Sequence, residues 1–101
     1  EFQSALDDLN MAISLDADLL VAYVNRAVAA YGLGDFEAAL ADYDHVAKIE
    51  PDRFDTYAHR SRALTMLGMD EQAAAGIALI LEQGADVVGL EDELAELRAI
   101  R

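Results

Sequence analysis

Apolar residues recur every three or four positions along most of the chain. This spacing is that of one face of an α-helix, and in the first fifteen residues it is formed by Phe2, Ala5, Leu6, Leu9, Ala12, Ile13 and Leu15. The same pattern predicts further helices over residues 19–31, 36–49, 53–67, 69–83 and 87–101. No stretch has the β-branched alternation of a strand, so the sequence predicts an all-α fold.

Glycine, proline and aspartate separate these helical patterns. Gly32, Gly34 and Gly68 can each end a helix because glycine adopts positive φ without steric cost, and Pro51 closes another. Aspartate side chains can cap the helices that follow, and the candidates are Asp16, Asp18, Asp35 and the pair Asp52 and Asp55, which resembles a capping box. The chain therefore reads as short helices joined by tight turns.

A period of 34 residues runs through the pattern. It relates Tyr23 to Tyr57, Arg26 to Arg60, Ala29 to Ala63, Gly34 to Gly68 and, backwards, Phe36 to Phe2. A fixed period of this length is the mark of a helical-repeat protein. The third copy is the most divergent, since Asp70 stands where the others have phenylalanine.

The period and its residues resemble the tetratricopeptide repeat (TPR), a helix-turn-helix unit of this length, over residues 1 to about 85. Its small-then-large pairs are matched by Ala5 and Leu9, Ala39 and Tyr43, and Ala73 and Ile77. The resemblance implies a right-handed α-solenoid of antiparallel helix pairs, a TPR-like superhelix. We expect one domain over 1–101, made of the second helix of a truncated repeat (1–17), a complete repeat (18–51), a divergent repeat (52–85) and a C-terminal capping helix (86–101).

Two expectations concern the ends of the chain. Residues 87–101 have polar residues behind an apolar face, which suits a cap on the last repeat, although the first helix of a further repeat is the alternative. The chain starts inside a repeat, so we expect the natural N-terminus to lie upstream.

The resemblance also implies a binding surface, because the first helices of such repeats line the concave face. The residues expected there are Val21, Val24, Asn25, Val28 and Tyr31 in one repeat and Asp55, Ala58, His59, Arg62, Thr65 and Met66 in the next. Asn25 matches a position where the family often uses asparagine to hold a peptide backbone. Family members that bind chaperone tails clamp a terminal carboxylate with lysines and an arginine. Here Asp55 and His59 occupy two of those positions, so the resemblance does not favour a carboxylate clamp.

Charged residues in the repeats also suggest a structural ladder. Asn25-Arg26-Ala27 with Asp42-Tyr43-Asp44 is similar to a family variant that has Asn-Arg-Gly and Asp-Tyr-Asp. We expect Asp8 and Asp42 to pair with Arg26, and Asp42 also with Arg60, because a partly buried guanidinium needs carboxylate partners.

Composition narrows the function. The formal charge of −13 opposes binding to nucleic acid or anionic lipid; it suits a basic partner, or it simply solvates the helix surfaces. No apolar run reaches the roughly 18–20 residues that span a bilayer. No enzyme motif is present, and the one helical pair of potential metal ligands, Asp55 and His59, is incomplete as a site.

We therefore expect a scaffold without catalytic residues, cofactor or metal, which binds a protein or peptide segment in its concave groove. A module that forms homo-oligomers and a regulatory appendage of a larger protein are the alternatives. The absence of cysteine leaves the compartment open, with the cytoplasm as the default expectation.

Overall fold

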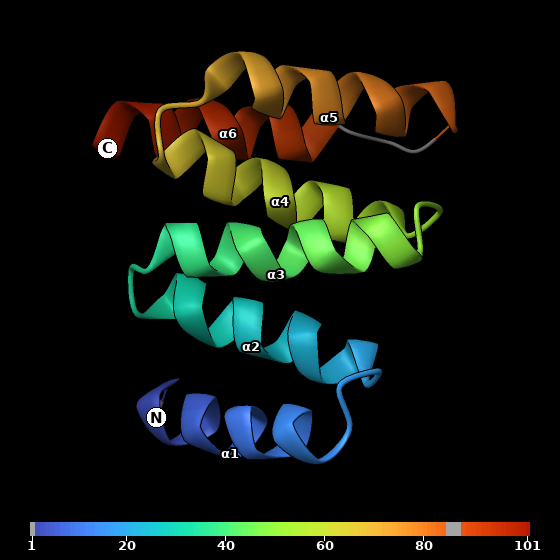
Figure 1. The fold of residues 1–101 in the computed structure, drawn as a ribbon. Coiled ribbons are helices and arrows are strands. Elements are labelled where there is room, and N and C mark those ends of the chain that lie inside the picture. The colour runs from blue at the N-terminus through green and yellow to red at the C-terminus, as the bar shows by residue number, and fades with distance from the viewer. Residues whose placement is uncertain (1, 85–87) are drawn as a thin grey trace.

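The computed structural model describes residues 2–84 and 88–101, and in these residues it is all-α. Consecutive helices run antiparallel and stack on one another from α1 to α5 (Figure 1). Their bounds are α1 Phe2–Leu15, α2 Leu20–Gly32, α3 Phe36–Ile49, α4 Phe54–Met66, α5 Asp70–Glu82 and α6 Val88–Ile100. This is the helical-repeat solenoid that the sequence predicts. Within the described residues, each helix is too short or too polar to cross a bilayer.

The turns after α2 and α4 are equivalent, as the period requires. Gly34 and Gly68 have φ of +82° and +78°, a conformation that suits glycine because it has no Cβ. Gly32 was expected to end α2 in the same way, but it is still helical. A Cβ on Gly32 would lie 2.4 Å from the ring of Phe2, so this glycine instead lets Phe2 approach α2 closely.

Only part of the predicted capping is present. The Asp35 carboxylate accepts a hydrogen bond from the backbone N–H of Ala38 and caps α3. The other predicted caps are wrong: α2 begins after Leu19 and α4 after Arg53, and neither residue makes a side-chain capping bond. Asp16 accepts from the N–H of Asp18 within the preceding turn, because the chain between α1 and α2 is long enough to make its own bend.

The core is built from small residues where helices cross. Ala27, Ala30, Ala39 and Ala63 are buried around Tyr43, at the junction of α2, α3 and α4. Between α4 and α5, a Cβ on Gly76 would lie 3.0 Å from the Ser61 hydroxyl. Such contacts bring the helix axes close together, so these positions tolerate little added volume.

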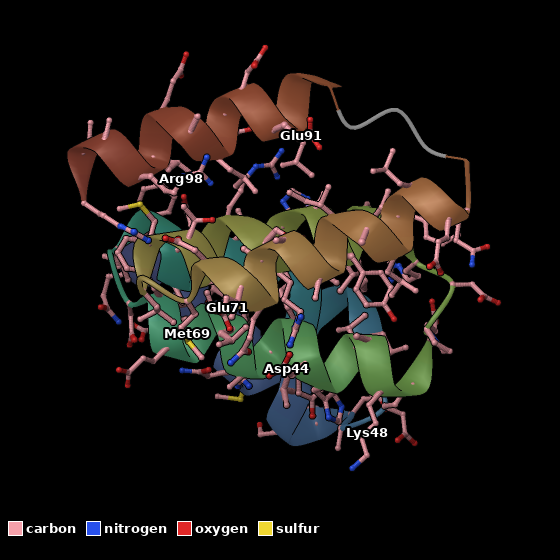
Figure 2. The ribbon with its side chains drawn as sticks, turned by 90° about the horizontal axis from the view of Figure 1, so that it is seen from above. Asp44, Lys48, Met69, Glu71, Glu91 and Arg98 are labelled. Atoms are coloured by element: carbon pink, nitrogen blue, oxygen red, sulfur yellow. The ribbon has the colours of Figure 1, made fainter. Side chains whose placement is uncertain are left out.

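Helix α6 leaves the stacking order of the other helices. It packs mainly on α4, and seen from above it lies to one side of the α4–α5 pair (Figure 2). Leu94 of α6 is buried against Ile77 and Ile80 of α5, with Leu90 and Leu97 beside it. Arg101 binds the carboxylate of Asp70 and donates to the backbone carbonyl of Thr65, which ties the end of α6 to the turn between α4 and α5. Asp70 thus holds a charged contact where the earlier repeats place phenylalanine. Residues 86 and 87 of the predicted cap lie outside the described residues.

Candidate functional site

Two neighbouring depressions open on one face of the helix stack. The first, of about 420 Å³, lies between α1 and α2 and is lined by Phe2, Ala5, Asp8, Leu9, Asn25, Val28 and Ala29. The second, of about 280 Å³, lies among α2, α3, α4 and α6 and is lined by Val28, Tyr31, Tyr43, His59, Arg62 and Glu93. Val28 lines both and is 44% exposed, so the two depressions adjoin at this side chain. We call them together the inner groove.

Apolar surface dominates the first depression. The exposed Phe2 ring and the half-buried Leu9 come from α1, and Val28 and the buried Ala29 come from α2. Asn25 supplies an exposed amide, which can both donate and accept hydrogen bonds. A surface of this kind suits an apolar side chain together with the backbone of the segment that carries it.

The second depression contains a small polar network. The Nε of Arg62 donates to the carboxylate of Glu93 at 2.7 Å, and one terminal nitrogen of Arg62 lies 2.8 Å from Nδ1 of His59. Since a guanidinium can only donate, Nδ1 of His59 accepts, and His59 is therefore neutral with its proton on Nε2. Burial lowers the pKa of His59, and the neighbouring charge of Arg62 lowers it further.

Aromatic rings form the floor of the second depression. The ring of His59 stacks on Tyr43, with centroids 5.7 Å apart and planes 12° from parallel. The rings of Tyr31 and Phe36 form a T-shaped pair, with centroids 5.1 Å apart. Burial raises the pKa of Tyr43 to about 12. Tyr43 is thus a fixed part of the scaffold, whereas Tyr31 is only half-buried and presents part of its ring to the groove.

The structure brings together five of the residues that the sequence placed on the concave face: Asn25, Val28, Tyr31, His59 and Arg62. The remaining residues expected there line neither depression. Val21 and Asp55 are exposed on the first turns of α2 and α4, and Val24 and Met66 are half-buried. Ala58 packs on the apolar cluster around Leu94, and Thr65 is fully buried, so the expectation that these two face the groove is wrong.

Several lining residues were not expected from the sequence. Phe2, Asp8 and Leu9 come from α1, whereas the sequence predicts groove residues only on α2 and α4 and predicts an ion pair with Arg26 for Asp8. Tyr43, the large member of a small-then-large pair, is buried, but it also lines the second depression. Glu93 depends on where α6 docks, and α6 lies outside the 34-residue period, so no repeat signal could have placed it.

The charged ladder differs in part from its expectation. Arg26 binds both oxygens of Asp42, with Nε–Oδ2 at 2.8 Å and a terminal nitrogen 2.7 Å from Oδ1. Its second terminal nitrogen donates to the amide oxygen of Asn10, not to Asp8, at 3.2 Å. Arg60 pairs with Asp44, not with Asp42.

These corrections have one geometric reason. Asn10 and Asp44 are 34 residues apart, so Arg26–Asn10 and Arg60–Asp44 are the same contact in successive repeats. The backward partner thus lies two residues beyond the expected one, on a different side of the helix, while Asp8 faces the first depression. Asp44 lies on the side of the molecule away from α6 (Figure 2).

A third depression, of about 430 Å³, is formed by a different set of side chains from α1 and α2, together with α3. Its charged groups include Arg26 and Asp42, which bind each other. The polar groups of this depression are therefore already engaged within the protein, unlike the exposed apolar surface of the inner groove.

Residues 21–53 match the sequence profile of the tetratricopeptide repeat. The matched segment covers α3, all of α2 except Leu20, and the positive-φ glycine between them. The chain belongs to the tetratricopeptide repeat family. TPR units are a non-catalytic fold that mediates protein–protein interaction, and the concave surface of such a solenoid is the usual place for a partner.

Two curated relatives support this assignment. The chain is 32% identical to RNA polymerase II-associated protein 3 of Mus musculus over 82 aligned residues. The aligned segment is 81% of the chain and 12% of that protein. It is 45% identical to serine/threonine-protein phosphatase 5 of Homo sapiens over 47 aligned residues, and this segment is 46% of the chain and 9% of that protein. The chain therefore spans about a tenth of the length of these relatives. No solved structure matches it significantly.

Proposed function

We propose that the inner groove binds a segment of a partner protein, as an extended peptide or as one face of a helix. The observation that carries this proposal is that two depressions adjoin at the exposed side chain of Val28. Together they offer apolar surface from α1 and α2 and a polar end at α4 and α6. Ligand sites in proteins combine apolar surface with a few polar groups, and they have volumes of roughly 300–1,000 Å³. The two depressions, of about 420 and 280 Å³, are comparable in size.

The contacts available in the groove suggest how a segment would be held. Val28 and Leu9 offer surface for a buried apolar side chain, which supplies most of the affinity in peptide recognition by grooves. The exposed amide of Asn25 is placed to bond a peptide backbone group, and the half-buried Tyr31 presents part of its ring. The groove performs recognition only and needs no chemical step.

A displayed library of random twelve-residue peptides, selected on the purified chain, tests this proposal. Selected peptides are then synthesised, and their affinity is measured by fluorescence anisotropy. The double variant Asn25→Ala/Tyr31→Ala should weaken binding about tenfold or more, which corresponds to roughly 1.4 kcal/mol. Its helical melt should remain cooperative but shift to a lower midpoint, because Asn25 is exposed whereas Tyr31 packs against Phe36 and the buried cluster around Tyr43.

The matched control is Gln83→Ala/Leu81→Ala. It also removes one amide and one large apolar side chain, but both are exposed at the end of α5, which contributes no residue to either depression. Its affinity should equal that of the wild type. If the groove variant binds as well as the wild type, or if the two double variants weaken binding equally, the site lies elsewhere.

Self-association is a second candidate function, because α1 carries two strongly exposed apolar side chains on one side. Met11 is 62% and Leu15 80% exposed, and they lie four residues apart on one helix face. Light scattering behind a sizing column, over a wide range of protein concentration, separates the candidates. A monomer throughout removes self-association, whereas a dimer that Met11→Gln/Leu15→Gln abolishes would support it.

A further inference from the structure

Among the residues that the structure describes, Arg62 is the cation that lines the inner groove, and its guanidinium is already bound within the protein. Its Nε donates to the carboxylate of Glu93 at 2.7 Å, and a terminal nitrogen donates to His59 at 2.8 Å. A carboxylate of a bound segment would therefore have to displace Glu93 to reach this guanidinium. Displacement would exchange one charge-assisted hydrogen bond for another and gain little.

The charges that remain in the groove are negative in sum. Of the described residues, Asp8 lines the first depression and Glu93 the second, against one positive charge from Arg62. Two negative charges and one positive charge leave −1. His59 contributes no charge, since its Nδ1 accepts from Arg62. The chain as a whole carries −13, so an acidic segment is repelled both over a distance and at the groove.

The side chains beside these charges suit the stem of a long basic residue. Val28 and Leu9 offer apolar surface, and the half-buried ring of Tyr31 lines the second depression beside Val28. Lysine and arginine bury their methylene stems on such surfaces while the charged end reaches a carboxylate, and a tyrosine ring also attracts a cation.

We propose that the inner groove takes a segment with an aliphatic side chain next to a lysine or arginine, and that Glu93, by holding Arg62, excludes acidic segments. This inference rests on the proposed function and states which class of partner the groove selects. Glu93 is then a specificity residue contributed by α6, and α6 completes the groove instead of only covering the end of the solenoid.

The test uses the peptides selected on the wild-type chain, each synthesised with an amidated C-terminus. We expect the selected peptides to contain lysine or arginine beside an aliphatic residue. Their affinity should fall as NaCl is raised from about 50 to 500 mM, because salt screens exposed charges. Glu93→Gln should lower the affinity for these peptides about fivefold or more. The same variant should bind copies of the peptides with glutamate in place of lysine more tightly than the wild type does. Arg62→Gln should act in the opposite direction and tighten the cationic peptides, since it leaves Glu93 unpaired.

The opposite signs distinguish selection of charge from support of the fold. If the Arg62–Glu93 pair only held α6 in place, both variants would weaken every peptide in the same way. Glu91→Gln is the matched control, since it removes the same charge from an exposed position on α6 (Figure 2). It should leave the affinities close to those of the wild type, and an effect as large as that of Glu93→Gln would overturn the role of Glu93.

Failure of this inference and failure of the proposed function give different results. Peptides that depend on Asn25 and Tyr31 but are rich in aspartate or glutamate, or that require a free C-terminal carboxylate, would overturn the inference and leave the groove as the binding site. Peptides that ignore Asn25→Ala/Tyr31→Ala would remove the site itself, and the inference with it.

Discussion

Replacing Arg26 by methionine removes the two hydrogen bonds that its guanidinium donates to the carboxylate of Asp42. These bonds are 2.8 and 2.7 Å long, and Asp42 is only 7% exposed. Methionine keeps most of the apolar stem of Arg26, so the change isolates the loss of charge. What remains is a nearly buried carboxylate without its partner, which makes this the sharpest test of how the repeats are held together.

The size of the effect follows from the burial of the two partners. Breaking a buried ion pair from one side costs about 3–5 kcal/mol. The Arg26 side chain is 26% exposed, so water can reach part of the site, and we lower the expectation to about 2–4 kcal/mol. The double variant Arg26→Met/Asp42→Leu should recover most of this loss, because an apolar pair of similar size needs no partner charge.

The control is the same substitution at the equivalent position of the next repeat. Arg60 pairs with Asp44, whose side chain is 49% exposed, so Arg60→Met should cost less than about 1 kcal/mol. The free energy of unfolding is measured by urea denaturation followed by circular dichroism. A cost below about 0.5 kcal/mol for Arg26→Met, or a larger cost for Arg60→Met, would refute the reasoning from burial.

Three other changes test the packing, the site and the turns. Ala39→Leu should destabilise by about 1–3 kcal/mol through overpacking, while Ala41→Leu, at an exposed position of the same helix, should be nearly neutral; equal urea midpoints would place Ala39 outside the helix crossing. The folded state lowers the pKa of His59, so the imidazole binds a proton more readily in the unfolded chain. The contribution of His59 to stability is therefore complete above pH 6.5 and is lost as pH falls through the pKa of the folded state. His59→Gln should reduce the dependence of the melting temperature on pH over that range. An unchanged slope of melting temperature against pH would contradict this. Gly34→Ala should cost about 1 kcal/mol because φ is +82°, whereas Gly89→Ala in α6 should cost nothing.

The repeated part of the fold could be predicted from the sequence because it has a period. The glycine turns, the Asp35 cap and the small residues around Tyr43 each recur or follow from helical spacing. The predicted caps at Asp16, Asp18, Asp52 and Asp55 failed because a turn with its own hydrogen bonds can use the same side chains differently. Local sequence does not decide between those uses.

The candidate site could be predicted only where one helix supplies it. Asn25, Val28 and Tyr31 share a face of α2, so helical spacing places them together. The partner of Arg60 was missed because a shift of two residues between packed helices moves a side chain to a different face. Glu93 was missed because α6 docks mainly on α4 and through the buried Leu94, and these contacts are specific to this end of the chain.

Mapping a bound peptide onto the chain by NMR tests the central claim most directly. The isotope-labelled chain is titrated with the tightest selected peptide, and the backbone amide shifts are followed. The account predicts the largest shifts at Asn25, Val28 and Tyr31 and at Arg62 and Glu93, with little change on the exposed side of α5. Shifts confined to the third depression, or to the exposed side of α1 at Met11 and Leu15, would contradict the claim that the inner groove is the binding surface.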